Sequence, residues 1–243
     1  NRLSLTQQFN SGAQLGGSYL IATSRPRPTS FSMLENSLSA IDKRINAVTQ
    51  EGTLKFLLPL NKKGAAMELT ADYLNRHSNE CADYSMDNDV VGATYDKDNL
   101  NLWKFKADFL YPRSSRLSWK FGASAQWISS TFTPSASIES DRFSVSSIPT
   151  GTSGFTPIVY ASAQGMVWKL RYSAGVNWQL NRIGYHDKQA DIKSHNTQWA
   201  INPTVQLMMP FGSKMNHTVM LNYKRTLSDI PYTAISSVVN WDD

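Results

Sequence analysis

Residues 102–127 read LWKFKADFLYPRSSRLSWKFGASAQW and contain two amphipathic runs around the turn Pro112–Ser114. In the first run, aromatic side chains and one alanine hold the odd positions from Trp103 to Tyr111, whereas two lysines and an aspartate hold even positions. The second run repeats this pattern, with apolar residues at every odd position up to Trp127. Because alternate residues of a strand point to opposite faces, the stretch predicts a β-hairpin with one apolar and one charged face.

The same period recurs elsewhere in the chain. From Trp168 to Leu180, apolar residues alternate with Lys169, Arg171 and uncharged polar side chains. Such faces carry Trp or Tyr at their ends and Ala, Phe, Leu or Val between, which is typical of a lipid-facing band bounded by aromatic girdles. No run approaches the ~20 apolar residues of a membrane helix. A membrane-embedded form is therefore expected to be a β-barrel, since a closed sheet satisfies every backbone group in lipid.

Composition is compatible with this reading. The 243 residues are 41% hydrophobic with a mean hydropathy of −0.37, as in soluble proteins and also in barrels, where only alternate residues meet lipid. The net charge of +5 is spread along the chain, so nucleic-acid binding is not expected. Cys81 is the only cysteine, which excludes an intramolecular disulfide framework. Asn1 opens directly on a strand-like segment, so we expect a mature protein or an excised piece.

The alternation predicts about ten strands in five hairpins. The expected strands are Arg2–Phe9, Ala13–Ile21, Thr53–Leu60, Ala65–Leu74, Leu102–Tyr111, Leu117–Trp127, Ile158–Gln164, Trp168–Leu180, Trp199–Met209 and His217–Arg225. Short turns are expected at Asn10–Gly12, Asn61–Gly64, Pro112–Ser114, Gly165–Met166 and Pro210–Ser213. Long polar loops are expected at Asn75–Asn99, Ser129–Thr156 and Asn181–Asn196.

Two segments stay open at this point. Leu34–Val48, within the polar stretch of residues 24–50, fits either a short helix or a further strand pair. Tyr232–Trp241 is a possible additional strand.

Connections of about 2–6 residues alternate with connections of about 15–27 residues, as in outer-membrane barrels with short periplasmic turns and long extracellular loops. A soluble antiparallel β protein is the alternative, although sandwiches have loops of mixed length at both ends. We therefore predict one all-β domain over residues 1–243, an antiparallel up-and-down transmembrane β-barrel in the bacterial outer membrane with membrane lipid as a partner.

Motifs in the last third resemble a known family. WKLRYSAGVNWQ (Trp168–Gln179), then Asn202–Leu207, then Leu221–Ile230 are similar to the barrel region of TonB-dependent receptors, in particular the outer membrane protein β-barrel family. The resemblance covers about Leu54–Asp243 and includes the pair Asp108-Phe109. It departs at Ile230-Pro231, where the family often has Arg-Pro, and at Gln179, where an acid is expected.

The resemblance implies the barrel portion of a receptor for nutrient uptake, with a plug domain, TonB and an unknown nutrient as partners and with no cofactor. Receptors of this kind close a barrel of about 22 strands, so about ten strands would be part of a larger wall or a divergent smaller barrel. The alternative function is an autonomous structural, adhesive or porin-like barrel without TonB-coupled transport. A plug domain encoded immediately upstream would favour the receptor.

Charged side chains on the predicted inward face are the candidate site residues, seven bases and three acids with an excess of four positive charges. They are Glu68, Asp72, Lys104, Lys106, Asp108, Arg116, Lys120, Lys169, Arg171 and Lys224. Such a wall would attract anionic solutes or an acidic plug face. The alternative is a wetted lumen whose charges are paired with one another.

Chemistry beyond binding is not expected. The four histidines form no HxxxH or HExxH motif, so no metal site is predicted. No serine lies in a GxSxG elbow. His186 and Asp187 are neighbours in sequence, and adjacent residues of a strand point to opposite faces. We therefore expect that the protein is not an enzyme.

Overall fold

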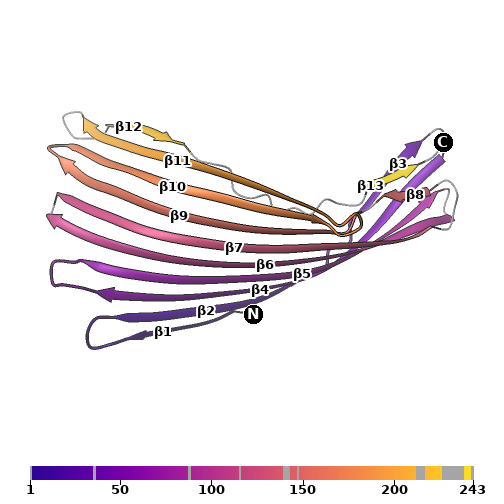
Figure 1. The fold of residues 1–243 in the computed structure, drawn as a ribbon, viewed down its shortest axis with the longest axis horizontal. Coiled ribbons are helices and arrows are strands. Elements are labelled where there is room, and N and C mark those ends of the chain that lie inside the picture. Colours follow the sequence, from indigo (N-terminus) through magenta and orange to yellow (C-terminus); the bar gives the residue numbers. More distant parts are fainter. Residues whose placement is uncertain are drawn as a thin grey trace.

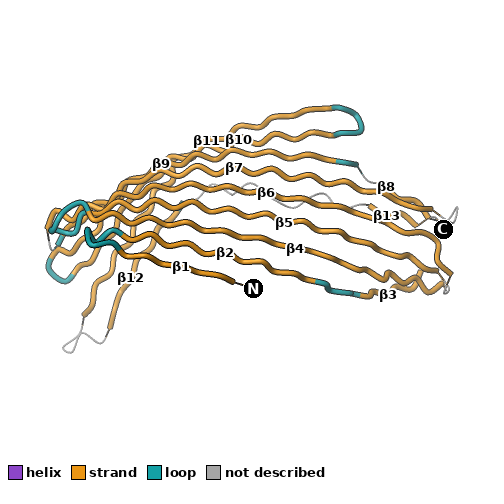
Figure 2. The backbone as a smooth tube through the Cα atoms, turned by 90° about the horizontal axis from the view of Figure 1, so that it is seen from below, coloured by secondary structure: helices purple, strands orange, loops and turns teal. Residues whose placement is uncertain are grey.

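The computed structural model describes residues 2–34, 37–86, 89–114, 116–138, 143–146, 148–211, 217–225 and 238–241. These residues form one long, curved antiparallel sheet with small additions at one end (Figures 1 and 2). The sheet runs through β1 (Arg2–Gln8), β2 (Gln14–Ser24), β4 (Ser37–Pro59), β5 (Ala66–Met86), β6 (Asp89–Ser114), β7 (Leu117–Ile138), β9 (Thr150–Val167), β10 (Leu170–Asp187), β11 (Ile192–Phe211) and β12 (His217–Lys224). The described part of the chain contains no helix long and apolar enough to cross a membrane.

Each strand pairs antiparallel with the strands before and after it on this path, which confirms the predicted all-β, up-and-down architecture. The path begins at β1 and ends at β12, and no pairing joins these two strands among the described residues. The sheet is therefore not closed. β3 (Thr29–Leu34) pairs with β4, and β8 (Phe143–Ser146) pairs with β13 (Val238–Trp241) in a separate two-stranded sheet.

Tight turns close the hairpins at one end, and the predicted turns at Asn10–Gly12 and Asn61–Gly64 are correct. The predicted turn Pro112–Ser114 is wrong, because β6 continues to Ser114 with a register irregularity between Pro112 and Ser114. Of the predicted turn Pro210–Ser213, Pro210 and Phe211 belong to β11, and the rest lies outside the described residues. Gly12 and Gly64 adopt φ values of 81° and 88°, which side chains with a Cβ rarely tolerate. In the second turn, the Asn61 side-chain oxygen accepts hydrogen bonds from the backbone N–H groups of Lys63 (2.9 Å) and Ala65 (3.0 Å). The Asn61 side chain thus satisfies backbone N–H groups that have no partner strand within the turn.

The predicted turn at Gly165–Met166 is wrong. β9 continues to Val167, and the turn consists of Trp168 and Lys169, with Trp168 at φ 53°. Gly165 is instead required by close packing, because a Cβ there would overlap the carbonyl oxygen of Arg116 and lie 2.7 Å from the Tyr172 hydroxyl. A glycine inside a strand often marks such an approach, and the sequence pattern does not separate this role from a turn.

The three predicted long loops are also wrong in their extent. β5 continues to Met86 and β6 begins at Asp89, so most of the expected loop Asn75–Asn99 is strand. In the same way β7, β9, β10 and β11 extend through much of the other two loops. These extensions carry polar residues on both faces, so the apolar alternation disappears while the backbone hydrogen-bond ladder continues.

Both open segments resolve as strands where they are described. Residues 29–34 and 37–59 form β3 and β4, so the strand-pair alternative holds and the helix does not. Residues 232–237 of the possible last strand lie outside the described residues, and β13 pairs with β8 rather than with β12. At the same end, Tyr84, Ala82 and Val91 form a small buried hydrophobic cluster against Ile41 and Met86.

Candidate functional site

The two faces of the sheet differ sharply. One face carries Trp103, Phe105 and Trp119, and we call it the apolar face. From the row of Phe105 to the row of Trp119 it has no charged residue on any described strand, whereas the row of Trp103 includes Arg182. Its large side chains are exposed. The opposite, polar face carries Asp108, Lys120 and their neighbours in register. Its Asp108, Gln179, Asn181 and Asn202 are buried, which places the concave side of the curved sheet on this face.

A continuous row of aromatic side chains ends the apolar face on the side away from the short turns. Tyr73, Trp103, Trp127 and Phe155 are neighbours in register, and their ring centroids lie 4.4 Å apart for Tyr73–Trp103 and 4.8 Å for Trp127–Phe155. We call this the outer girdle row. From Trp103 to Tyr111 the strand rises about 27 Å, or about 20 Å in height at a tilt of 35–45°, close to the apolar band of membrane barrels.

The centre of the polar face is a charge cluster around Asp108, which is 7% exposed. Its Oδ2 accepts from Lys106 Nζ at 2.6 Å and Lys120 Nζ at 3.2 Å, while the Tyr160 hydroxyl donates to Oδ1. One carboxylate therefore receives two ammonium groups and a phenol, so most of the local charge is paired. Charge-assisted hydrogen bonds of this kind are among the strongest in proteins.

A glycine makes room for the tyrosine. Gly122 lies opposite both Asp108 and Tyr160 in register, and a Cβ on Gly122 would overlap the Tyr160 ring. The ring therefore lies across the backbone of β7 and reaches Asp108 on β6. This contact connects three strands through one side chain.

The predicted charged residues separate into groups. Glu68, Asp72, Lys104, Lys106, Asp108 and Lys120 come together on the polar faces of β5, β6 and β7. Lys55 adds an ion pair to Glu68 (3.0 Å), and Thr53 donates to Asp72 (3.0 Å). Lys55 was missed although it alternates correctly within Thr53–Leu60. Tyr160 was also missed, because nothing local in the sequence indicates a contact 52 residues away.

The remaining predicted residues lie elsewhere. Arg171 is on the polar face of β10 near the short turn, whereas Lys224 is on the polar face of β12 at the end away from its turn, opposite Thr204. Arg116 and Lys169 are in turns rather than on strand faces, which corrects the prediction for both. The ammonium group of Lys169 lies over the Trp168 ring at 5.2 Å from its centroid. The prediction for Lys169 failed for the same reason as the predicted turn at Gly165–Met166, because β9 continues to Val167 and the turn follows it.

The polar face of β9, β10 and β11 is mostly uncharged and rich in amides. Asn202, only 1% exposed, donates from Nδ2 to Gln179 Oε1 (3.3 Å), and Gln179 donates from Nε2 to Asn181 Oδ1 (3.0 Å). Within the described part of the chain, the side-chain oxygens of Asn177 and Asn202 accept no hydrogen bond. Gln179, where the family resemblance leads one to expect an acid, is thus a member of an amide network.

A hollow of about 500 Å³ lies at the short-turn end of the polar face. Arg116 and Arg171 line it together with Gln164 and Gln206. Among the described side chains no carboxylate forms an ion pair with either guanidinium. The arrangement can attract an anionic group from the concave side of the sheet.

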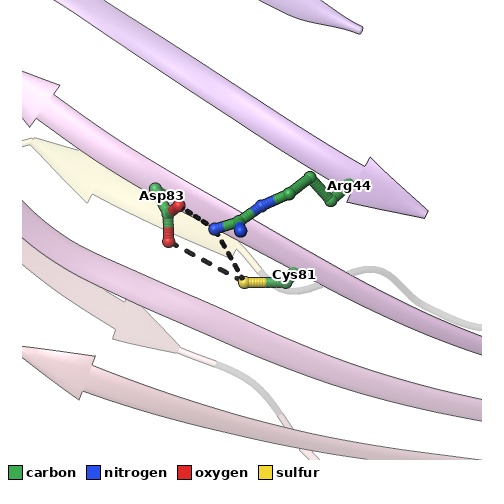
Figure 3. A network of polar contacts seen from close by, with 3 residues as sticks. All are labelled: Arg44, Cys81 and Asp83. Atoms are coloured by element: carbon green, nitrogen blue, oxygen red, sulfur yellow. Dashed lines mark hydrogen bonds and ion pairs between the residues drawn. The ribbon is translucent and has the colours of Figure 1, made fainter. Parts of the chain in front are cut away.

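Beyond the outer girdle row, Cys81 lies between two charged residues (Figure 3). Arg44 forms an ion pair with Asp83 and lies 3.9 Å from the Cys81 sulfur, which is 3.8 Å from Asp83. Burial raises the pKa of the Cys81 thiol, Asp83 raises it further, and Arg44 lowers it. The thiol is therefore mostly protonated at neutral pH.

The acid that pairs with His186 is Asp191, not its sequence neighbour Asp187. His186 Nε2 lies 2.8 Å from Asp191 Oδ1, and this contact lowers the pKa of Asp191. Asp187 instead accepts from the backbone N–H groups of Gln189 and Ala190 in the turn. Over the described ranges, no three His, Cys, Asp or Glu side chains lie close enough to hold a metal ion.

No family model matches the sequence, and no curated protein matches it either. Among solved structures, the chain is similar to the crystal structure of ferric citrate transporter FecA in the unliganded form, with a TM-score of 0.43 and 8% sequence identity. The match covers 87% of this chain and 42% of that one, so this chain spans less than half the length of the transporter.

Proposed function

We propose that the chain is part of the wall of a bacterial outer-membrane transporter that takes up a nutrient with the help of a plug domain and TonB. The observation that carries the proposal is the division of one curved sheet into a convex face that is uncharged between its aromatic edges and a concave polar face with a charge cluster. An exposed apolar surface of this extent is unfavourable in water and favourable in lipid.

The open sheet supports a wall rather than a complete pore. Among the described residues, β1 and β12 each pair with one strand only, so each presents backbone N–H and C=O groups at an outer edge of the strand order. Such groups cost several kcal/mol each in hydrocarbon, so further strands must pair with both edges in the membrane. A barrel wide enough for a plug requires about 22 strands, which leaves room for a wall of this size within it.

The polar face would then contact the plug or the solute. The Asp108 cluster is largely paired, whereas Arg116 and Arg171 at the short-turn end have no described ion partner. An acidic plug surface or an anionic solute fits this end best. No residue set on the described strands calls for catalysis, and the proposal includes no enzymatic step.

Growth of a deletion strain tests the proposal. The strain should fail to grow, or grow slowly, on at least one limiting nutrient in a panel of iron chelates, cobalamin and oligosaccharides. Deleting TonB should reproduce the same defect, and the complete protein supplied on a plasmid should restore growth. Normal growth on every member of the panel, together with stable uniform channels from the purified protein, would favour the second candidate.

That second candidate is a structural, adhesive or porin-like barrel. The projecting hairpins favour it, because β5 and β6 continue well past the outer girdle row with polar side chains on both faces. Binding of cells to host or abiotic surfaces, lost when the tip of the β5–β6 hairpin is deleted, would support adhesion.

A further inference from the structure

We propose that the outer surface of the sheet holds the phosphate of an anionic membrane lipid between Arg182 and His195, directly above the outer girdle row. The proposal rests on the membrane location proposed above. It concerns the lipid-facing side of the wall, and it is separate from the solute and the plug.

The register places an arginine within the aromatic row. Phe155 is the neighbour of Trp127 on one side and of Arg182 on the other, so the row of aromatic residues ends in a guanidinium on β10. Arg182 is exposed, and no described carboxylate forms an ion pair with it. An unpaired arginine at the edge of an apolar band points to an anion at headgroup level.

The next row carries the second donor. His195 on β11 lies opposite Gly184, which lies opposite Ser153 on β9. A Cβ on Gly184 would lie 2.8 Å from the Ser153 hydroxyl and 3.1 Å from His195 Nδ1, so a larger residue would displace the imidazole. Glycine therefore leaves open the space between His195 and Arg182.

These residues surround a hollow of about 470 Å³. Its floor includes Trp103, Trp127 and Phe155, and its rim includes Arg182 and His195. An apolar floor beside two nitrogen donors suits a lipid, with acyl chains over the aromatic rings and a phosphate at the rim. A free phosphate ion would use the rim alone.

Charge on the surrounding surface favours the same ligand. On the described strands, this outward surface has no acid from the outer girdle row to the third row beyond it, at Lys97. The basic and imidazole side chains there are Lys97, Arg182, Lys193, His77, His186 and His195, of which His186 pairs with Asp191 from the adjoining turn. Successive residues on one face of a strand are about 7 Å apart, and the headgroup layer is about 5–8 Å deep. Arg182 lies in the outer girdle row and His195 in the next row, so both lie at the depth of the headgroups.

Lipid binding by the complete natural protein tests the inference. Native mass spectrometry in detergent would follow titration with diphosphoryl lipid A, with the same lipid after removal of both phosphates, and with inorganic phosphate. The variants are Arg182→Gln, His195→Gln and the pair together. Arg76→Gln is the matched control, because it removes the same charge at a similar height on the polar face.

We expect Arg182→Gln to weaken diphosphoryl lipid A binding by roughly tenfold or more, as for the loss of a charge-assisted hydrogen bond. The double variant should lose more, and Arg76→Gln should match the wild type. The dephosphorylated lipid should bind all variants equally. Equal lipid A affinity in wild type and Arg182→Gln, or inorganic phosphate binding as tightly as lipid A, would overturn the inference.

Membrane location is measured separately by flotation with outer-membrane vesicles. If the wild type does not float, the proposed function and this inference both fail. If it floats and supports uptake, but Arg182→Gln leaves the affinity for lipid A unchanged, only the proposal of the lipid site fails.

Discussion

At the scale of single residues, Asp108 and Tyr160 show how the polar face of the sheet holds a nearly buried charge. The carboxylate is nearly buried, but two lysines and a phenol satisfy it, and Gly122 supplies the space that the phenol ring needs. A buried charge that is paired and hydrogen-bonded costs far less than an isolated one. The arrangement ties β6, β7 and β9 together by side chains in addition to the backbone ladder.

Gly122→Ala should destabilise the protein. The new methyl group forces the Tyr160 ring away and breaks its hydrogen bond to Asp108, at a cost of about 1–3 kcal/mol. Urea unfolding in lipid vesicles measures the loss. Adding Tyr160→Ala removes the overlap, so the double variant should lose less than the sum of the single variants. Additive losses would mean that the ring does not lie over Gly122.

The reactivity of Cys81 should depend on its two charged neighbours. The thiolate is the reactive form, and burial and Asp83 raise the thiol pKa above its ordinary value. Labelling by a maleimide should therefore be slow at pH 7 and rise about tenfold per pH unit up to that pKa. Asp83→Asn should speed labelling at pH 7 and Arg44→Gln should slow it. Opposite or absent changes would contradict the contacts in Figure 3.

At the scale of the strand, the face of each residue decides its tolerance to charge. Ala123 on β7 lies between Ala107 and Val159 in the middle of the apolar face, whereas Ser124 lies on the polar face opposite Lys106. One step along the chain thus separates the apolar face from the concave polar face. A slip of one residue in the register would exchange the two environments.

Ala123→Arg should cost about 2–4 kcal/mol in folding into a bilayer, because the charge would face acyl chains. Ser124→Arg should cost no more than about 1 kcal/mol, the size of repulsion from a like charge directly opposite. Denaturant titrations in vesicles compare the two variants. Equal penalties would show that the faces are assigned wrongly.

At the scale of the whole molecule, the short turns and the projecting hairpins lie at opposite ends of the sheet (Figure 1). In the proposed membrane orientation, the projecting ends lie outside the cell. Cys81 on β5 is a native reporter of that end. A membrane-impermeant thiol reagent should label it on intact cells at alkaline pH. Labelling that requires cell lysis would reverse the orientation.

Closure gives a second prediction at this scale. The chain of 243 residues, reconstituted alone in planar bilayers, should give no uniform, stable conductance steps, because no pairing joins β1 to β12 over the described ranges. The complete protein is the matching control. Regular steps from the 243 residues alone would identify a self-contained small barrel and favour the porin or adhesin.

The sequence by itself determined the class of fold and the identity of the two faces. Alternation from Trp103 to Trp127 depends only on the two-residue period of a strand, and this period persists in any register that keeps the apolar side out of water. The turns at Asn10–Gly12 and Asn61–Gly64 were also readable, because their residues favour turns locally.

Only the tertiary structure decided how far the strands continue, which side chains meet and whether the sheet closes. Past the outer girdle row both faces are polar, so hydrophobic periodicity carries no signal while cross-strand hydrogen bonds still hold the hairpins together. The contact of Tyr160 with Asp108, and the position of Arg182 beside Phe155, depend on the register of strands distant in sequence. Register is a property of pairs of strands, and no single strand contains it.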